Sequence, residues 1–305
     1  MKKIATLMAA LMLMTAVFAG CSGTDNGSSS AAGESSTTSE SSVAEESSVA
    51  SETSETSEEA STTETGDYGE FATIEEGKLI MSTNAQFPPY EMVADGEGFN
   101  GTGFEGIDVE IASAIADKLG LELQIDDMEF DSALLAVQNN TADVMLAGLS
   151  YSEERDEVVD FSTSYATGVQ VVIVKEGSDV TMDNLGEKMI GTQRGTTGYI
   201  YASDTPENGG YGEDHVQAYD NGATAVQALV NGQIDAVIID QAPAEEFVAA
   251  NDGLTILPGN WVEEKYCAAV DEGNTALLDA IDTALQELID DGTVQEILDK
   301  YITAE

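Results

Sequence analysis

Arginine is scarce in this chain of 305 residues: it occurs only at Arg155 and Arg194, against 58 aspartates and glutamates. The planar guanidinium grips a carboxylate through two parallel hydrogen bonds, which suits arginine to holding small anions. Both arginines follow short apolar runs, Arg155 within Gly148–Arg155 and Arg194 within Gly191–Gly198. We therefore expect a small-anion site that uses one or both of them.

Other chemistry has little support in the sequence. His215 is the only histidine, and no cysteine–histidine cluster, phosphate-binding loop or nucleophile elbow is present. We expect no cofactor, no metal and no catalytic residue. The net charge of −48 argues against nucleic acid as a partner, because binding needs cations facing the phosphates.

Alternating strands and helices must position the arginines. The predicted elements are, in order, a strand at 78–83, a helix from 106 to Gly120, a strand at 121–125, a helix at 131–139 and a strand at 142–149. This alternation favours parallel α/β layers. Segments 136–145 and 228–237 resemble each other, which indicates a similar helix–turn–strand unit in each of two lobes.

Two extended segments are expected to connect these lobes as a hinge. Residues 169–174 are a β-branched run, and 265–270 form a second extended segment. Helices are predicted at 277–290 and 294–301, with Gly292 between them. The predicted division is a first part of lobe 1 at 67–168, lobe 2 at 169–266, and a return strand with C-terminal helices, mostly in lobe 1, at 267–305.

The N-terminus is typical of an exported lipoprotein. Two lysines precede an apolar stretch from Ile4 to Phe18, which is too short for a membrane span. Phe18-Ala19-Gly20-Cys21 resembles a bacterial lipobox, so 1–20 are predicted as signal peptide and Cys21 as a lipidated (palmitate-bearing) first residue. An ordinary secretory signal is the alternative.

Residues 21–66 are predicted as a disordered tether that carries this lipid. Beyond Cys21 they are nearly all Ser, Thr, Glu, Gly and Ala, and such a segment buries too little apolar surface to fold. Cys267 is the only other cysteine, so a lipidated Cys21 leaves no intramolecular disulfide.

An ordered set of motifs resembles a known family. The segments are Thr83–Glu91, Gly106–Ile111, Asp143–Arg155, Gly195–Thr197 and Ile234–Asp240. Together they look like the extracellular solute-binding proteins of polar amino acid ABC importers, family 3, in a lipoprotein form, over residues 70–303. The resemblance implies a two-lobed periplasmic-binding-protein-like fold (type II), in which each lobe is a mixed, mainly parallel sheet flanked by helices and two strands form the hinge.

The resemblance also implies how the two ends of an amino acid are held. Arg155 matches the arginine that binds the α-carboxylate, and Ser150 and Thr197 match hydroxyl donors to it from opposite lobes. Asp240 matches the acid that pairs with the α-ammonium. Gly148 matches a position of close backbone approach, and Ala147 matches another pocket position. From the residues alone, an exposed ion pair for Arg155 and helix caps for Thr196, Thr197 and Asp240 remain open.

The side-chain end of the ligand is less defined. The resemblance places an aromatic at Phe87 over the ligand side chain and adds Tyr90 and Phe130, although core packing is an alternative for Phe87 and Tyr90. Asn84 stands where many relatives have Asp, which weakens the case for a cationic ligand. Arg194 at the pocket edge would suit an acidic or amide side chain, or else point outward on its turn.

The implied function is capture of a free L-amino acid, polar neutral or acidic, by hinge closure and delivery to an ABC permease. The protein is expected to be a non-enzymatic monomer, held outside the cell membrane by its lipid as in Gram-positive bacteria. Alternatives are a cyclohexadienyl dehydratase-like enzyme, for which Glu91 is the candidate acid, and a ligand-sensing lipoprotein on the same fold.

Overall fold

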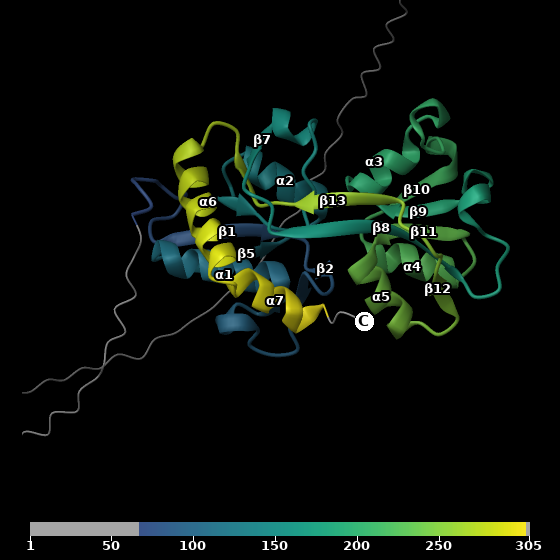
Figure 1. Cartoon of the computed structure of the whole chain (residues 1–305), viewed down its shortest axis with the longest axis horizontal. Helices are drawn as coiled ribbons and strands as arrows, with labels where there is room; N and C mark the ends of the chain where they lie inside the picture. Colours follow the sequence, from purple (N-terminus) through teal and green to yellow (C-terminus); the bar gives the residue numbers. More distant parts are fainter. Residues whose placement is uncertain (1–66, 303–305) are drawn as a thin grey trace, which may run out of the picture. The chain divides into compact units, whose positions relative to one another are not determined.

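The computed structural model describes residues 67–302, which lie within one compact unit, Ser61–Glu305. Two main sheets form this unit, each with its own helices (Figure 1). The first has the strand order β5-β1-β6-β14-β7. Its strands are β1 (Lys78–Thr83), β5 (Glu122–Asp127), β6 (Val144–Met145), β7 (Val159–Phe161) and β14 (Ala269–Asp271). β1 pairs in parallel with β5 and β6, whereas β14 is antiparallel to β6 and β7.

Helices cover both faces of the first sheet because side chains alternate along its strands. Leu79 and Met81 of β1 pack into a cluster with Ile107 and Ile111 of helix α1 (Ile107–Leu119). Ile80, between them, packs instead with residues of α2 (Phe130–Gln138). The C-terminal helices α6 (Thr275–Asp290) and α7 (Thr293–Tyr301) contact α1. A small sheet of β2 (Gln86–Phe87), β3 (Glu91–Val93) and β4 (Phe104–Glu105) follows β1.

The second sheet has the order β10-β9-β11-β8-β12, and β13 also pairs with β8. Its strands are β8 (Ala166–Lys175), β9 (Ile190–Gln193), β10 (Val216–Tyr219), β11 (Ala236–Asp240), β12 (Leu254–Ile256) and β13 (Val262–Tyr266). β9 is parallel to β10 and β11, and β8 is antiparallel to β11, β12 and β13. The helices α3 (Thr197–Ser203), α4 (Gly222–Val230) and α5 (Gln241–Ala250) belong to this part.

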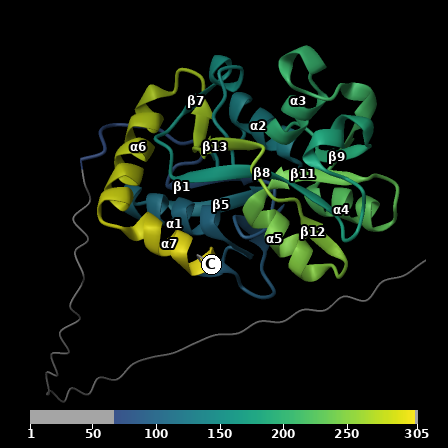
Figure 2. The same ribbon diagram turned by 45° about the vertical axis from the view of Figure 1, so that its right-hand side comes forward.

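β8 and β13 run side by side between the two groups of elements (Figures 1 and 2). The chain reaches β8 from β7 of the first sheet and leaves β13 for β14 of the same sheet. The predicted segment 265–270 is therefore two strands, interrupted at Cys267 and Ala268. The predicted boundary between 168 and 169 falls inside β8, and the proposed division into domains stays a prediction.

Most predicted elements are present with small shifts at their ends. β1 has the predicted bounds, and α1 ends at Gly120, whose φ of +70° forms a left-handed cap. The predicted strand at 142–149 is wrong in length, because only β6 (Val144–Met145) has strand pairing. The chain turns at Gly148, which has φ +52° and donates its N–H to Asp108 Oδ2 at 2.7 Å.

The two similar helix–turn–strand segments share a hydrogen-bond device. Asp143, before β6, accepts the N–H of Ile80 at 2.8 Å. Asp235, before β11, accepts the N–H of Met189 at 2.9 Å. In each case the aspartate ties the turn to the neighbouring parallel strand, which gives a physical reason for the repeated Asp.

Candidate ligand-binding site

One pocket is lined by residues from both main sheets and the segments that follow them. The lining residues are Asn84, Phe87, Glu91, Phe130, Ala147, Gly148, Ser150, Arg155, Gln170, Gln193, Thr196, Thr197, Ile238, Ile239 and Asp240. The structure thus brings together every residue predicted to bind ligand except Tyr90 and Arg194. Sequence reasoning did not name Gln170, Gln193, Ile238 or Ile239 for this site.

Arg155 is buried in this pocket, with 5% of its surface exposed. Its Nη1 donates to the carbonyl oxygen of Ser150 at 2.6 Å, and its Nη2 donates to that of Gly195 at 2.9 Å. The guanidinium carbon lies 5.5 Å from the centroid of the Phe130 ring, within cation–π range. Gly195 follows β9, so the arginine connects the first sheet's segment to the second sheet's segment.

The charge of Arg155 has no carboxylate in contact. Among residues 67–302, no carboxylate oxygen lies within 4.0 Å of its nitrogens, so the exposed ion pair is ruled out. Burial lowers the pKa of the guanidinium, and the negative charge of Glu264 opposes this shift. A buried cation held by neutral carbonyls favours the arrival of an anion.

Asp240 supplies the opposite charge at the end of β11. Its Oδ2 accepts from Gln170 Nε2 at 2.8 Å, and its Oδ1 accepts a short hydrogen bond from the Tyr266 hydroxyl. Asp240 precedes α5, but its side chain makes no cap hydrogen bond, which rules out the helix-cap alternative. Burial and the charge of Glu264 raise the pKa of Asp240 to about 7.

Glu264 of β13 is a buried acid that sequence reasoning missed. Its Oε2 accepts from Ser150 Oγ at 3.1 Å, Gln170 Nε2 at 2.9 Å and Thr197 Oγ1 at 2.9 Å. Inward and outward residues alternate along β13, and Glu264 shares the inward face with Tyr266. That alternation was the available signal, because an acid two residues before a buried tyrosine faces the interior.

A neutral amide pair joins the two sheets' segments at another part of the pocket. Gln193 Nε2 donates to Asn84 Oδ1 at 2.9 Å, and Asn84 Nδ2 donates to the carbonyl oxygen of Met128 at 2.8 Å. The Asp131 side chain also approaches the Gly195 backbone closely here, because a Cβ added to Gly195 would lie 1.5 Å from Asp131 Oδ1. Glycine suits this contact between the two lobes, because a Cβ would displace the Asp131 side chain and the φ of +74° disfavours other residues.

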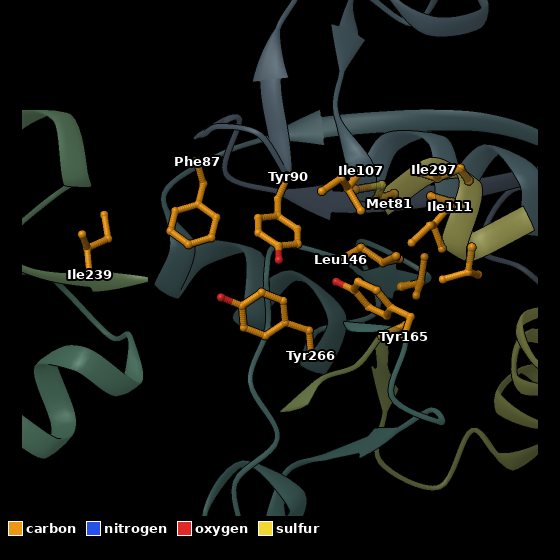
Figure 3. Close-up of a cluster of buried hydrophobic side chains, with 14 of the residues drawn as sticks. Met81, Phe87, Tyr90, Ile107, Ile111, Leu146, Tyr165, Ile239, Tyr266 and Ile297 are labelled. Carbon is orange, nitrogen blue, oxygen red and sulfur yellow. The ribbon is translucent and has the colours of Figure 1, made fainter. Parts of the chain in front are cut away.

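Three aromatic rings, those of Phe87, Tyr90 and Tyr266, pack together beside the pocket, and Phe87 is the one that lines it (Figure 3). Phe87 stacks on Tyr90 with ring centroids 5.8 Å apart, and Tyr90 meets Tyr266 edge-on at 5.1 Å. A Cβ on Gly148 would lie 2.7 Å from Phe87 Cε1, so glycine lets the ring sit against the backbone. Tyr90 does not line the pocket, and the structure places it behind Phe87 in the buried cluster.

A second buried acid, Glu91, also lines the pocket and is fully buried. Burial and the neighbouring charge of Asp108 raise the pKa of Glu91 well above its usual value. Burial raises the pKa of Asp108 to about 6, although the hydrogen bond from the Gly148 N–H opposes the shift. Burial and the charge of Asp108 thus both favour the protonated form of Glu91.

Arg194 lies outside the pocket. Its side chain is 55% exposed, and its Nη2 lies 3.8 Å from Oδ1 of Asp220. The two arginines are thus in opposite environments, one buried at the pocket and the other on the surface. A contact of Arg194 with ligand remains a prediction that this position does not favour.

Several remaining predictions concern metals and membranes. Among residues 67–302, no group of three or more His, Cys, Asp or Glu side chains could hold a metal ion. None of the helices in that range has the length and apolar character that crossing a membrane requires. The predicted lipid site Cys21 and its tether lie outside the described residues.

Comparison with known proteins places the chain among transport proteins. Residues 79–304 match the family "Bacterial extracellular solute-binding proteins, family 3". The arginine-binding extracellular protein ArtP of Bacillus subtilis is 33% identical over 232 residues, covering 75% of this chain and 87% of ArtP. The L-cystine-binding protein TcyJ of Escherichia coli is 31% identical over 235 residues, covering 76% of this chain and 85% of TcyJ.

The solved structures support the same grouping. A crystal structure of a mutant of ArgBP from T. maritima has 36% sequence identity and a TM-score of 0.67, covering 75% of this chain and 96% of that one. The fold prediction of a two-lobed periplasmic-binding-protein-like α/β protein is confirmed.

Proposed function

Because the chain belongs to family 3 of the bacterial extracellular solute-binding proteins, we propose that it captures a free L-amino acid and delivers it to an ABC permease. The observation that carries the proposal is the guanidinium of Arg155, which is buried in the pocket and has no carboxylate partner among residues 67–302. An anion that enters the pocket gains a charge-assisted contact there.

The two ends of the ligand follow from the two charged side chains. The α-carboxylate binds Arg155, with Ser150 and Thr197 as further donors. The α-ammonium binds Asp240, whose ionised form it stabilises against burial. These groups come from both lobes, so closing the lobes around the ligand completes its contacts and shifts the population toward the closed form.

The lining favours a polar neutral side chain on the ligand. The amides of Asn84 and Gln193 both donate and accept, and Phe87 and Phe130 offer apolar surface. An acidic side chain would lack a second cation, since Arg194 lies outside the pocket. The proposed ligands are therefore polar neutral amino acids. Arginine and cystine, the ligands given in the names of ArtP and TcyJ, are the informative compounds to compare with them.

The location of the protein is the remaining part of the proposal. Residues 1–20 act as a lipoprotein signal, and lipidated Cys21 with the tether to residue 66 holds the monomer at the outer side of the cell membrane. The net charge of −48 argues against a polybasic contact with the membrane, so the lipid on Cys21 must provide the attachment.

A thermal-shift panel of the twenty amino acids and cystine tests the proposal on the purified folded part. A ligand at 100 times its Kd adds about 2.7 kcal/mol to the free energy of unfolding, which raises the Tm measurably. We expect glutamine, asparagine, serine or threonine to give the largest shift. If none of the compounds raises the Tm, amino acid binding is contradicted. If glutamate or aspartate gives the largest rise in Tm, the assignment of a polar neutral side chain is contradicted.

Glu91 supports a second candidate, a dehydratase on the same fold. Glu91 is a buried carboxyl group in a pocket wall, and burial raises its pKa, as a general acid requires. Incubation with prephenate or arogenate, followed by the absorbance of the aromatic product, tests it with Glu91→Gln as control. Turnover that Glu91→Gln abolishes would favour the enzyme, and the absence of turnover leaves the binding protein.

A further inference from the structure

Glu264 lies where the two lobes and their connecting strands meet. It belongs to β13, one of the two strands that run between the lobes, and only 6% of its surface is exposed. One oxygen, Oε2, accepts all three hydrogen bonds described above, from Ser150, Gln170 and Thr197. The other oxygen, Oε1, is buried and has no hydrogen-bond partner within the described range 67–302.

The donors to Glu264 come from both lobes. Ser150 follows β6 of the first sheet and forms an isolated bridge with Tyr266. Thr197 begins α3, beside the second sheet. A single carboxylate oxygen therefore joins a hydroxyl group of each lobe, with contacts of 3.1 Å and 2.9 Å.

The same two hydroxyls are the proposed donors to the ligand's α-carboxylate. A serine or threonine hydroxyl has one proton, so it cannot donate to Glu264 and to a ligand carboxylate at the same time. A second carboxylate placed at these donors would also be repelled by the first, strongly so in a buried site. Glu264 and the ligand thus compete for the same protons.

We propose that Glu264 is an internal stand-in for the ligand carboxylate, which latches the lobes together through Ser150 and Thr197 until an entering ligand takes over these donors. This inference rests on the proposed function for the identity of the competitor. Gln170 stays as a donor to Glu264 after the exchange, so the acid keeps one partner while the two hydroxyls turn to the ligand. This latch, the pair of hydrogen bonds from Ser150 and Thr197 to Glu264, lowers ligand affinity because it stabilises the ligand-free protein.

The test compares Glu264→Gln with Glu263→Gln, since Glu263 is the exposed neighbour on the same strand. Isothermal titration with L-glutamine measures the affinity, and circular dichroism confirms that each variant folds. We expect Glu264→Gln to bind L-glutamine about tenfold more tightly than the parent protein, because a charge-assisted competitor is removed. The α-amide of L-glutamine, which lacks the carboxylate, should gain nothing.

A measurement without ligand tests the latch itself. Small-angle scattering should show a larger radius of gyration for Glu264→Ala than for the parent protein, and no change for Glu263→Ala. An unchanged radius for Glu264→Ala overturns the latch, whatever the binding data show.

The binding outcomes separate the two proposals. If the parent protein binds L-glutamine and Glu264→Gln binds it equally or more weakly, the stand-in is wrong while amino acid binding holds. If neither protein binds any amino acid of the panel, the proposed function is wrong. The idea that a ligand carboxylate competes with Glu264 for Ser150 and Thr197 is then wrong too. The scattering result then decides whether Glu264 still holds the lobes together.

Discussion

Replacement of Arg155 by methionine is the most direct test of the pocket. Methionine keeps an apolar stem against Phe130 and removes the charge together with the hydrogen bonds to the carbonyl oxygens of Ser150 and Gly195. Loss of a buried partner for a ligand charge costs about 2–5 kcal/mol of binding free energy. At about 1.4 kcal/mol per factor of ten, Kd rises between roughly 30-fold and several thousandfold.

Folding should be affected much less than binding. The guanidinium makes two hydrogen bonds but is buried without a carboxylate partner, so the lost contacts are offset by removal of a buried charge. We therefore expect a small change in the Tm of the protein without ligand. The large effect should appear only in the Tm increase that ligand produces.

The second arginine provides the matched control. Arg194→Met removes the same charge from an exposed position outside the pocket, and it should leave Kd within about twofold, as is usual for surface substitutions. Isothermal titration and thermal shift on both variants give the comparison. Wild-type affinity in Arg155→Met, or an equal loss in both variants, would refute the assignment of the carboxylate site.

Further predictions concern three other positions. Burial and the charge of Glu264 raise the pKa of Asp240 from 3.8 to about 7, so affinity for an amino acid should fall as pH drops from 8 to 5. The Asp240 contribution to folding stability is fully present only below pH 3.8 and is lost as pH rises from there through about 7; Asp240→Asn should flatten both profiles in pH-dependent titration and melting. Gly148→Ala should lower the free energy of unfolding by about 1–3 kcal/mol and weaken binding, because the left-handed backbone and the close approach to Phe87 both resist a Cβ. Gly177→Ala has a similar left-handed backbone but no close neighbour, so comparing the two variants in denaturant melts isolates the effect of the Phe87 contact. Cys21→Ala should release the protein from membranes into the medium, as cell fractionation would show; retention at the membrane would contradict the lipid anchor.

Local elements could be predicted because their determinants lie close together in the chain. Apolar residues spaced by four defined α1, and Gly120 ended it through its left-handed cap. The strand predicted at 78–83 coincides with β1. The overestimated strand at 142–149 shows the limit, since the N–H of Gly148 is taken by the distant Asp108 and the chain turns away from the sheet.

The class of fold, the order of most elements and the type of residue available to hold an anion could be predicted without a structure. The resemblance already assigned the carboxylate to Arg155, but only the tertiary structure showed that Arg155 is buried and Arg194 exposed, because burial depends on what the other lobe covers. It also decided the partners of Glu264, which joins Ser150 and Thr197 across separations of 114 and 67 residues. Contacts between residues so far apart in the chain depend on how the lobes and their connecting strands pack, and local periodicity in the sequence does not predict this packing.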